Sequence, residues 1–170
     1  MELLNKIEAA LAGLYKGAPK LSQNAKKTIV NIWPIAALVF GALQLWAAWV
    51  LWDWGRKVNQ VVDVFNAYLG TDVGVRNLSA IYWISLVVLV LDAILLLAAY
   101  RGLKARAKSG WNLLFYGALL NALYGVFSAF NDYGGAGSLI IQLIVSAIVL
   151  YFLFAIRDQY SGAKSSANAV

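Results

Sequence analysis

Residues Leu86–Leu97 read LVVLVLDAILLL, an apolar run with a single carboxylate, Asp92, in its middle. The whole chain of 170 residues is 62% hydrophobic and only 13% charged, with a mean hydropathy of +0.69. This composition lies far outside the usual range of soluble domains, so a bilayer is the expected solvent. A helix needs roughly 20 apolar residues to cross about 30 Å of hydrocarbon. The run around Asp92 belongs to a stretch of that length.

Four stretches meet this length requirement, at residues 28–52, 77–100, 109–131 and 133–156. The sequence therefore predicts an all-α, polytopic membrane protein. Its transmembrane domain, residues 28–156, is expected to be a bundle of four transmembrane helices.

Two segments outside these spans are predicted to form amphipathic interfacial helices. In the cytoplasmic N-terminal segment, residues 1–27, apolar side chains recur at helical spacing: Leu3, Leu4, Ile7, Leu11, Leu14 and Tyr15. After the first span a similar stripe ends before a glycine: Trp54, Val58, Val61, Val62, Phe65 and Tyr68. A helix packed on the bundle is the alternative for this second segment. The cytoplasmic tail, residues 157–170, is predicted to be disordered because its last ten residues are small and polar.

The basic residues are distributed unevenly about the four spans. Eleven of the 14 lie in the N-terminal segment, in the loop at residues 101–108 or in the tail, and three lie in the other two loops. The positive-inside rule then predicts a multi-pass protein of the cytoplasmic membrane with both termini in the cytoplasm. The same charges favour contact with anionic membrane lipids. Nucleic acid is not an expected partner, because topology accounts for the basic excess.

Tryptophans and small residues refine this arrangement. Trp is enriched at membrane interfaces. Five tryptophans near the predicted span edges are therefore expected to be anchors. They are Trp33 and Trp111 on the cytoplasmic side, and Trp52, Trp54 and Trp83 on the outer side.

Small residues let helix backbones approach closely. The predicted packing positions are Gly41, Ala48, Gly117 and Gly125.

Asp92 is expected to share a polar layer with one side chain from each other span. Asp92, Asn121, Gln44 and Ser146 all lie eight to eleven residues from the cytoplasmic edge, close to the midplane. An ionised carboxylate without a cation is costly in hydrocarbon. We therefore expect Asp92 to be protonated at neutral pH and to donate a hydrogen bond to Asn121 or Gln44.

Three roles are open for this acid. It is a polar pin that fixes the register of the bundle, the titrating site of a proton-coupled or cation-conducting protein, or a contact to a cation on another membrane subunit.

The residue types that are missing exclude much catalytic chemistry. The chain has no Cys and no His, so it cannot supply a thiolate, a haem-ligating His, or an ordinary zinc or copper site. The spans contain no paired acids, phosphate loop or nucleophile with a base. The sequence thus predicts a protein that is not an enzyme, with no catalytic residue, no metal and no cofactor.

Three short motifs resemble those of a known group of proteins. They are Leu21-Ser22-Gln23-Asn24-Ala25-Lys26-Lys27, Pro34 with Ala37-Leu38-Val39-Phe40-Gly41, and Ala107-Lys108-Ser109-Gly110-Trp111-Asn112-Leu113-Leu114-Phe115-Tyr116. Through them, residues 21–157 are similar to a group of small, uncharacterised four-span bacterial integral membrane proteins. That group has no known activity, so the resemblance implies the fold and a bacterial inner membrane, and nothing about chemistry. Asp92 and the Trp-rich end of the first span lie outside the shared motifs.

Together these features favour a non-enzymatic membrane protein that acts as an oligomeric or partner-binding scaffold. Its expected partners are further copies of the chain or other membrane proteins. The expected contact surfaces are the Trp-rich face of the first span and the outer amphipathic helix. The alternative is a small proton-coupled transporter or channel that uses the midplane carboxylate.

Overall fold

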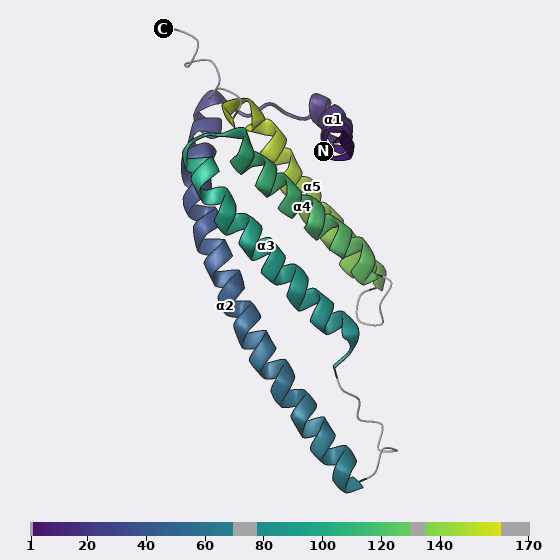
Figure 1. Ribbon diagram of the computed structural model, residues 1–170. Helices are drawn as coiled ribbons and strands as arrows, with labels where there is room; N and C mark the ends of the chain where they lie inside the picture. Colours follow the sequence, from purple (N-terminus) through teal and green to yellow (C-terminus); the bar gives the residue numbers. More distant parts are fainter. Residues whose placement is uncertain (1, 70–77, 130–134, 161–170) are drawn as a thin grey trace.

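The computed structural model describes residues 2–69, 78–129 and 135–160, and every regular element in these ranges is helical (Figure 1). The N-terminal helix α1 (Glu2–Leu14) is followed by a short 3-10 helix, η1 (Tyr15–Gly17). Four longer helices and a second 3-10 helix come next: α2 (Gln23–Leu69), α3 (Ala80–Lys104), α4 (Lys108–Ala129), α5 (Gly135–Ala155) and η3 (Arg157–Tyr160). The prediction of an all-α chain is confirmed for these residues.

Two of the described helices are long and apolar enough to cross a membrane. They are α3 and, within α2, the stretch Gln23–Tyr68. The apolar part of α5, Leu139–Ala155, is shorter. The structure therefore supports transmembrane helices, although fewer than the four expected. The predicted span ends at residues 77, 131 and 133 lie outside the described residues.

Helix α2 is longer than the sequence predicted. The first span was expected to end at Trp52 and a separate interfacial helix to follow, but α2 continues through this point as one helix of 47 residues. The predicted break was wrong because α3 packs against this part of α2. An ion pair on the exposed side also spans the point, with Lys57 Nζ 2.6 Å from Asp53 Oδ2. The hydrogen bond from Lys57 also holds the pKa of Asp53 below its ordinary value.

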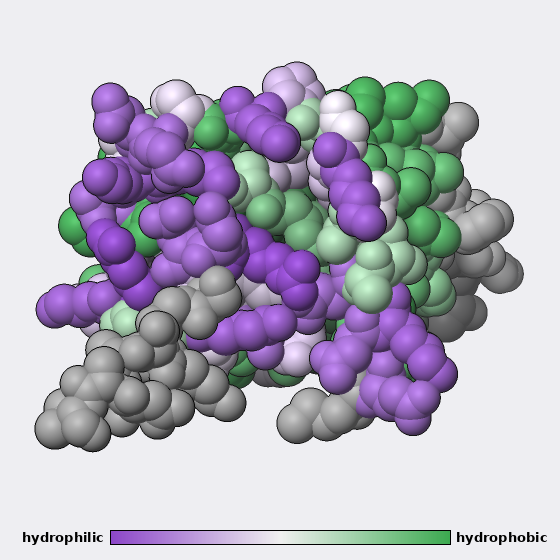
Figure 2. All heavy atoms as spheres, turned by 90° about the horizontal axis from the view of Figure 1, so that it is seen from above, coloured by the Kyte–Doolittle hydropathy of each residue, from purple (hydrophilic) through white to green (hydrophobic). Residues whose placement is uncertain are grey.

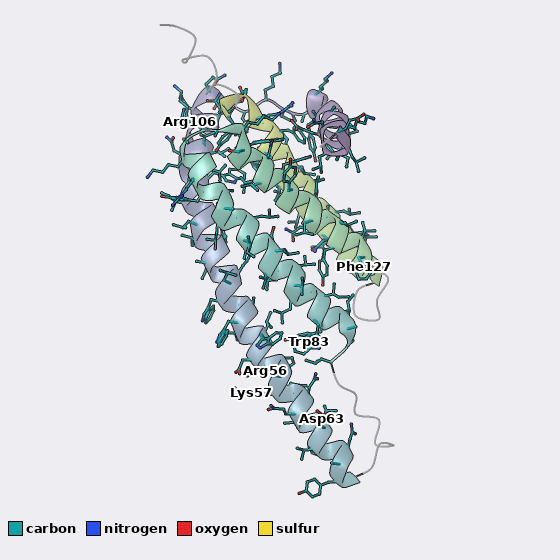
Figure 3. The ribbon with its side chains drawn as sticks, viewed as in Figure 1. Arg56, Lys57, Asp63, Trp83, Arg106 and Phe127 are labelled. Atoms are coloured by element: carbon teal, nitrogen blue, oxygen red, sulfur yellow. The ribbon has the colours of Figure 1, made fainter. Side chains whose placement is uncertain are left out.

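Contact with α3 secures the same part of α2. A Cβ built on Gly55 would lie 2.8 Å from a ring carbon of Tyr82, so the glycine lets α3 approach closely. At about 1.5 Å per residue, α2 is roughly 70 Å long, more than twice the thickness of hydrocarbon. Figure 3 shows Arg56, Lys57 and Asp63 on its distal part, far from Arg106 at the other end of the molecule.

The long helices pack in chain order, α2 on α3, α3 on α4 and α4 on α5. Within the described ranges, α2 and α5 do not pack along each other, so the helices form a curved row that is open on one side rather than the compact bundle expected. Figure 1 shows α1, the α3–α4 turn and η3 at one end of this row. Hydrophilic side chains spread over that end, which we call the basic end (Figure 2).

The α3–α4 turn depends on two glycines in direct contact. A Cβ built on Gly102 would lie 2.6 Å from the backbone nitrogen of Gly110, and one built on Gly110 would overlap Gly102 and the nitrogen of Leu103. Between them, Ala107 N donates to Gly102 O at 2.8 Å. Because the obstructing atoms are backbone, rotation of a side chain cannot make room for a Cβ.

The densest part of the core lies near the basic end. Its fully buried side chains come from α3, α4, α5 and η3: Leu103, Trp111, Phe115, Leu153, Ile156 and Tyr160. Trp111 is 0% exposed, and its Nε1 donates to Leu153 O at 2.8 Å. The prediction of Trp111 as an interfacial anchor was therefore wrong, because its indole packs inside the protein and finds its hydrogen-bond partner there.

The C-terminal boundary also needs a correction. Residues 157–160 were assigned to a disordered tail, but they form η3, and the ring of Tyr160 is buried against the core. Burial raises the pKa of Tyr160 to about 12, so its hydroxyl stays neutral at physiological pH. Apolar burial of this ring is what extends the ordered chain. The rest of the predicted tail, residues 161–170, lies outside the described residues.

Helix α1 is attached to the basic end by charge and by apolar contact. Glu8 is buried, with Oε1 3.1 Å from Lys108 Nζ, and it also pairs with Arg157. Ile7, Leu11 and Tyr15 pack against the core. The amphipathic helix predicted here thus uses one face to bind the helix row.

Replacing Gly110 with Ala tests the α3–α4 contact. The new Cβ would overlap backbone, so we expect the free energy of unfolding in detergent to fall by about 2 kcal/mol or more. Gly13→Ala is the matched control, because no atom lies within 4 Å of the position that a Cβ would occupy there. That change should be neutral or stabilise by up to about 1 kcal/mol. Equal thermal stability of the two variants would contradict the close contact.

Candidate functional site

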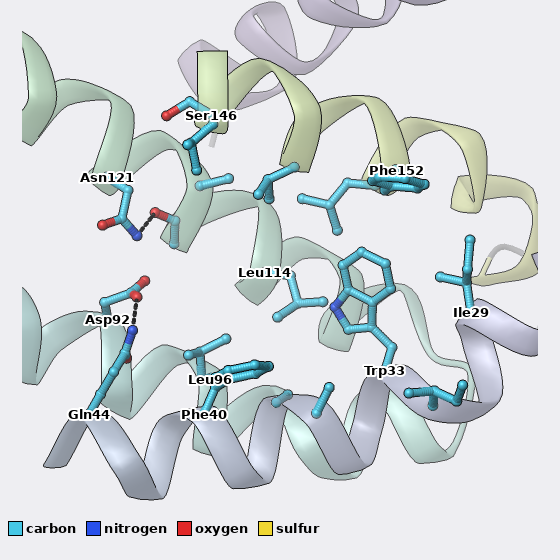
Figure 4. A pocket seen from close by; sticks show the side chains of 18 of the residues that line it. Ile29, Trp33, Phe40, Gln44, Asp92, Leu96, Leu114, Asn121, Ser146 and Phe152 are labelled. Carbon is cyan, nitrogen blue, oxygen red and sulfur yellow. Dashed lines mark hydrogen bonds between the residues drawn. The ribbon is translucent and has the colours of Figure 1, made fainter. Parts of the chain in front are cut away.

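The open side of the helix row contains a cavity of about 640 Å³ between α2 and α5. We call it the apolar cavity, because most of its wall is hydrocarbon, including Phe40, Leu96 and Phe152 (Figure 4). Five polar side chains gather at one end of it: Gln44, Asp92, Asn121, Gln142 and Ser146. Its volume is typical of a site for a small organic molecule.

Asp92 is the ionisable group of this polar end, and only 6% of its surface is exposed. Gln44 Nε2 donates to Asp92 Oδ2 at 3.0 Å (Figure 4). The other carboxyl oxygen, Oδ1, lies 2.8 Å from the position that a Cβ on Gly117 would occupy. The glycine on α4 therefore makes room for the carboxyl group on α3.

The predicted polar layer comes together in the structure, and of the two expected partners Gln44 is the one that pairs with Asp92. Asn121 Nδ2 donates to Gly117 O at 3.1 Å, in its own helix, and Asp92 pairs with Gln44. In that pair the amide donates and Asp92 accepts, the reverse of the expected direction. Asn121 was an unsuitable partner because the carbonyl one turn earlier is within its reach.

The polar layer predicted from the depth of residues along the spans did not include Gln142. This residue lines the apolar cavity together with Ser146, which is one turn further along α5. Both lie on the small, polar face of the helix at a spacing of four residues, so facial periodicity was the signal that could have identified it.

Gln44 has an acceptor that the protein does not satisfy. Its Oε1 is buried and has no hydrogen-bond partner among the described residues. A buried acceptor left without a donor costs roughly 1–3 kcal/mol. This oxygen is enclosed by protein atoms, so the missing bond is a cost of holding the amide nitrogen of Gln44 against Asp92.

A second, smaller cavity of about 230 Å³ meets the same polar residues. It shares Gln44, Asp92, Asn121 and Gln142 with the apolar cavity, and we call it the hydroxyl cavity because Tyr82, Ser85 and Tyr124 line it. Ser85 Oγ donates to Ile81 O at 2.6 Å, so Tyr124 is the donor in its 2.5 Å contact with Ser85. The carboxyl group of Asp92 thus borders both cavities.

The predicted packing positions all lie at contacts between helices. A Cβ on Gly41 would be 2.8 Å from Leu97 of α3, and one on Gly125 would overlap Gln142 of α5. Ala48 is buried in α2, and Gly117 faces Asp92. Close approach at Gly125 is what holds the amide of Gln142 beside the other polar groups.

The remaining tryptophans divide into two groups. Trp33 is half-buried and lines the apolar cavity, into which its ring points (Figure 4). The open side of the row leaves space for this ring. Trp52 and Trp83 contact edge to face at 5.3 Å, and Trp54 lies 6.2 Å from Tyr82. Trp52 and Trp54 are exposed, as an interfacial position requires.

The described residues contain no group of three His, Cys, Asp or Glu side chains that could hold a metal ion. Comparison of the chain with protein-family models, with curated proteins and with solved structures finds no match. The functional argument therefore rests on the geometry around Asp92.

A double-mutant cycle tests the contact between Gly117 and Asp92. Gly117→Ala should displace the carboxyl group and lower the free energy of unfolding by roughly 1–3 kcal/mol. In an Asp92→Ala background the same change should cost at least about 1 kcal/mol less, because the obstructing atom is gone. Thermal unfolding of the four proteins in detergent measures both values. An equal cost in the two backgrounds would show that the two residues do not touch.

Proposed function

We propose that the protein crosses the cytoplasmic membrane four times, with α2, α3, α4 and α5 as the spans. Helices α4 and α5 have 22 and 21 described residues, and at about 1.5 Å per residue each matches roughly 30 Å of hydrocarbon. The clustering of Lys and Arg at the basic end supports a cytoplasmic location for that end and for both termini. The distal part of α2 then extends beyond the outer membrane surface.

Within this arrangement, the function that the geometry supports best is binding of a small lipophilic amine at Asp92, in exchange for a proton. The observation that carries the proposal is the apolar cavity with a buried carboxyl group at its polar end. This proposal corresponds to the small proton-coupled transporter or channel that the sequence offered as the alternative. It adds the chemical class of the ligand.

The lining of the cavity favours a cation with an apolar body. Among the described residues that form its wall, Asp92 is the one ionisable side chain and none is Lys or Arg. An ammonium group beside an ionised Asp92 would gain strong Coulomb attraction in a medium of low dielectric constant.

The exchange of a proton follows from the same environment. A proton and an ammonium group cannot both occupy one carboxylate, so the two compete for Asp92. Because proton and ammonium compete, affinity for the amine should rise with pH as long as the amine stays charged.

The test is calorimetric titration of detergent-solubilised protein with 4-phenylbutylamine, a cation at neutral pH. Asp92→Asn keeps the shape of the side chain and removes its charge. The loss of a buried charge partner should weaken binding about thirtyfold or more. Asp53→Asn, at a half-buried carboxylate outside both cavities, is the matched control and should bind as the native protein does.

The neutral analogue 4-phenylbutanol separates charge from apolar contact. Its affinity should change less than threefold in Asp92→Asn. If the amine binds the native protein and the Asp92→Asn variant equally well, Asp92 is not the binding group and the proposal is wrong.

The scaffold function expected from sequence has separate support in the distal part of α2. Beyond Trp54 this helix exposes Val61, Val64, Phe65 and Tyr68, which in the proposed topology lie outside the hydrocarbon. Apolar side chains in that position favour contact with a second copy or with another membrane protein.

Phe65→Glu tests this second function. A charge placed in an apolar contact should weaken the affinity between copies at least about tenfold, which native mass spectrometry in detergent measures. Gln60→Glu adds the same charge to an exposed polar site on α2 and should leave assembly unchanged. A native protein that is monomeric at all concentrations and retains no partner from native membranes would rule out the scaffold.

A further inference from the structure

A third cavity, of about 410 Å³, lies at the basic end between the chain segment Tyr15–Leu21 and the end of α5. Four basic residues line it, Lys16, Lys20, Lys26 and Arg157, together with one carboxylate, Asp158. We call it the basic cavity. Its lining is amphipathic, because aromatic and small aliphatic side chains form the rest of the wall.

Hydrogen bonds between the two walls hold this cavity in shape. The hydroxyl of Tyr15 donates to Ala147 O of α5 at 3.0 Å, and the hydroxyl of Tyr151 donates to Pro19 O at 2.7 Å. The ring of Tyr15 also stacks on Phe154, with centroids 5.5 Å apart. These three contacts fasten the segment before α2 to α5, so the cavity exists before any ligand binds.

The charges of the cavity fall into a paired set and a free set. Lys26 Nζ lies 2.9 Å from Asp158 Oδ2, and Arg157 pairs with the buried Glu8. Lys16 and Lys20 are exposed and form no ion pair with any described residue. Two ammonium groups thus remain available at a cavity whose own carboxylate, Asp158, is already paired with Lys26.

We infer that the basic cavity binds the headgroup of an anionic phospholipid. Phosphate oxygens accept from the ammonium groups of Lys16 and Lys20, and the acyl chains continue along the apolar outer surface of α5. The position of the cavity fits this ligand, because the apolar part of α5 ends at Ala155, beside Arg157 and Asp158. The inference uses the membrane topology proposed above but not the amine site at Asp92.

The experiment titrates the full-length protein, in a neutral detergent, with short-chain dihexanoyl phosphatidylglycerol and follows binding by native mass spectrometry. We expect one lipid per chain, bound at least tenfold more tightly than dihexanoyl phosphatidylcholine. At roughly fivefold per lysine near a membrane surface, Lys16→Gln with Lys20→Gln should weaken binding of phosphatidylglycerol about thirtyfold. Both sites are exposed, so the fold should persist, which thermal unfolding checks.

The matched control is Lys27→Gln with Lys104→Gln, which removes two charges from the basic end outside the cavity. It should change affinity less than threefold, and Asp92→Asn should leave lipid binding unchanged even if amine binding is lost. Equal losses in the two double variants would overturn the inference in favour of unspecific attraction to the basic end. Glycerol 3-phosphate binding as tightly as the lipid would overturn it in favour of a soluble phosphate ester.

Discussion

The hydrogen bond from Gln44 to Asp92 joins α2 to α3 at the point where a carboxyl group has to be accommodated among apolar helices. Gly117 of α4 leaves space for the second carboxyl oxygen, and Gly125 brings Gln142 of α5 to the same level. In hydrocarbon no water can replace these partners, so the helices must bring their own polar groups to the acid. The position of each helix in the row depends on meeting that requirement.

The sizes of the side chains at the helix contacts explain why the row stays open between α2 and α5. Small residues draw α2 onto α3, α3 onto α4 and α4 onto α5, while α2 and α5 face each other across the apolar cavity with bulky side chains such as Trp33 and Phe152. The core is closed near the basic end, where Trp111 and Tyr160 are buried and Glu8 binds Lys108 and Arg157. The closely packed basic end therefore makes the helix row rigid, and the middle of the row leaves space around the ionisable side chain of Asp92.

Sequence reasoning predicted the helical class, the polar residues that meet near Asp92 and the small residues at helix contacts, because hydropathy, spacing and depth along a helix are local properties. It failed where a contact between distant segments decides the outcome. The uninterrupted α2 depends on α3 beside Gly55, and the burial of Trp111 depends on Leu153. The sequence left Gln44 and Asn121 both open as partners of Asp92, and in the structure Gln44 pairs with it while Asn121 bonds the carbonyl of Gly117 in its own helix. The basic cavity arises from two segments more than 100 residues apart, which no local pattern brings together.

A proton and an ammonium group compete for Asp92 in the proposed function. The affinity for 4-phenylbutylamine, measured by calorimetry at values between about pH 8 and about pH 4, tests this competition most directly. The affinity should fall as the pH is lowered in the native protein and stay constant in Asp92→Asn. An equal fall in both proteins would contradict the competition, because the loss of binding would then not depend on this carboxyl group.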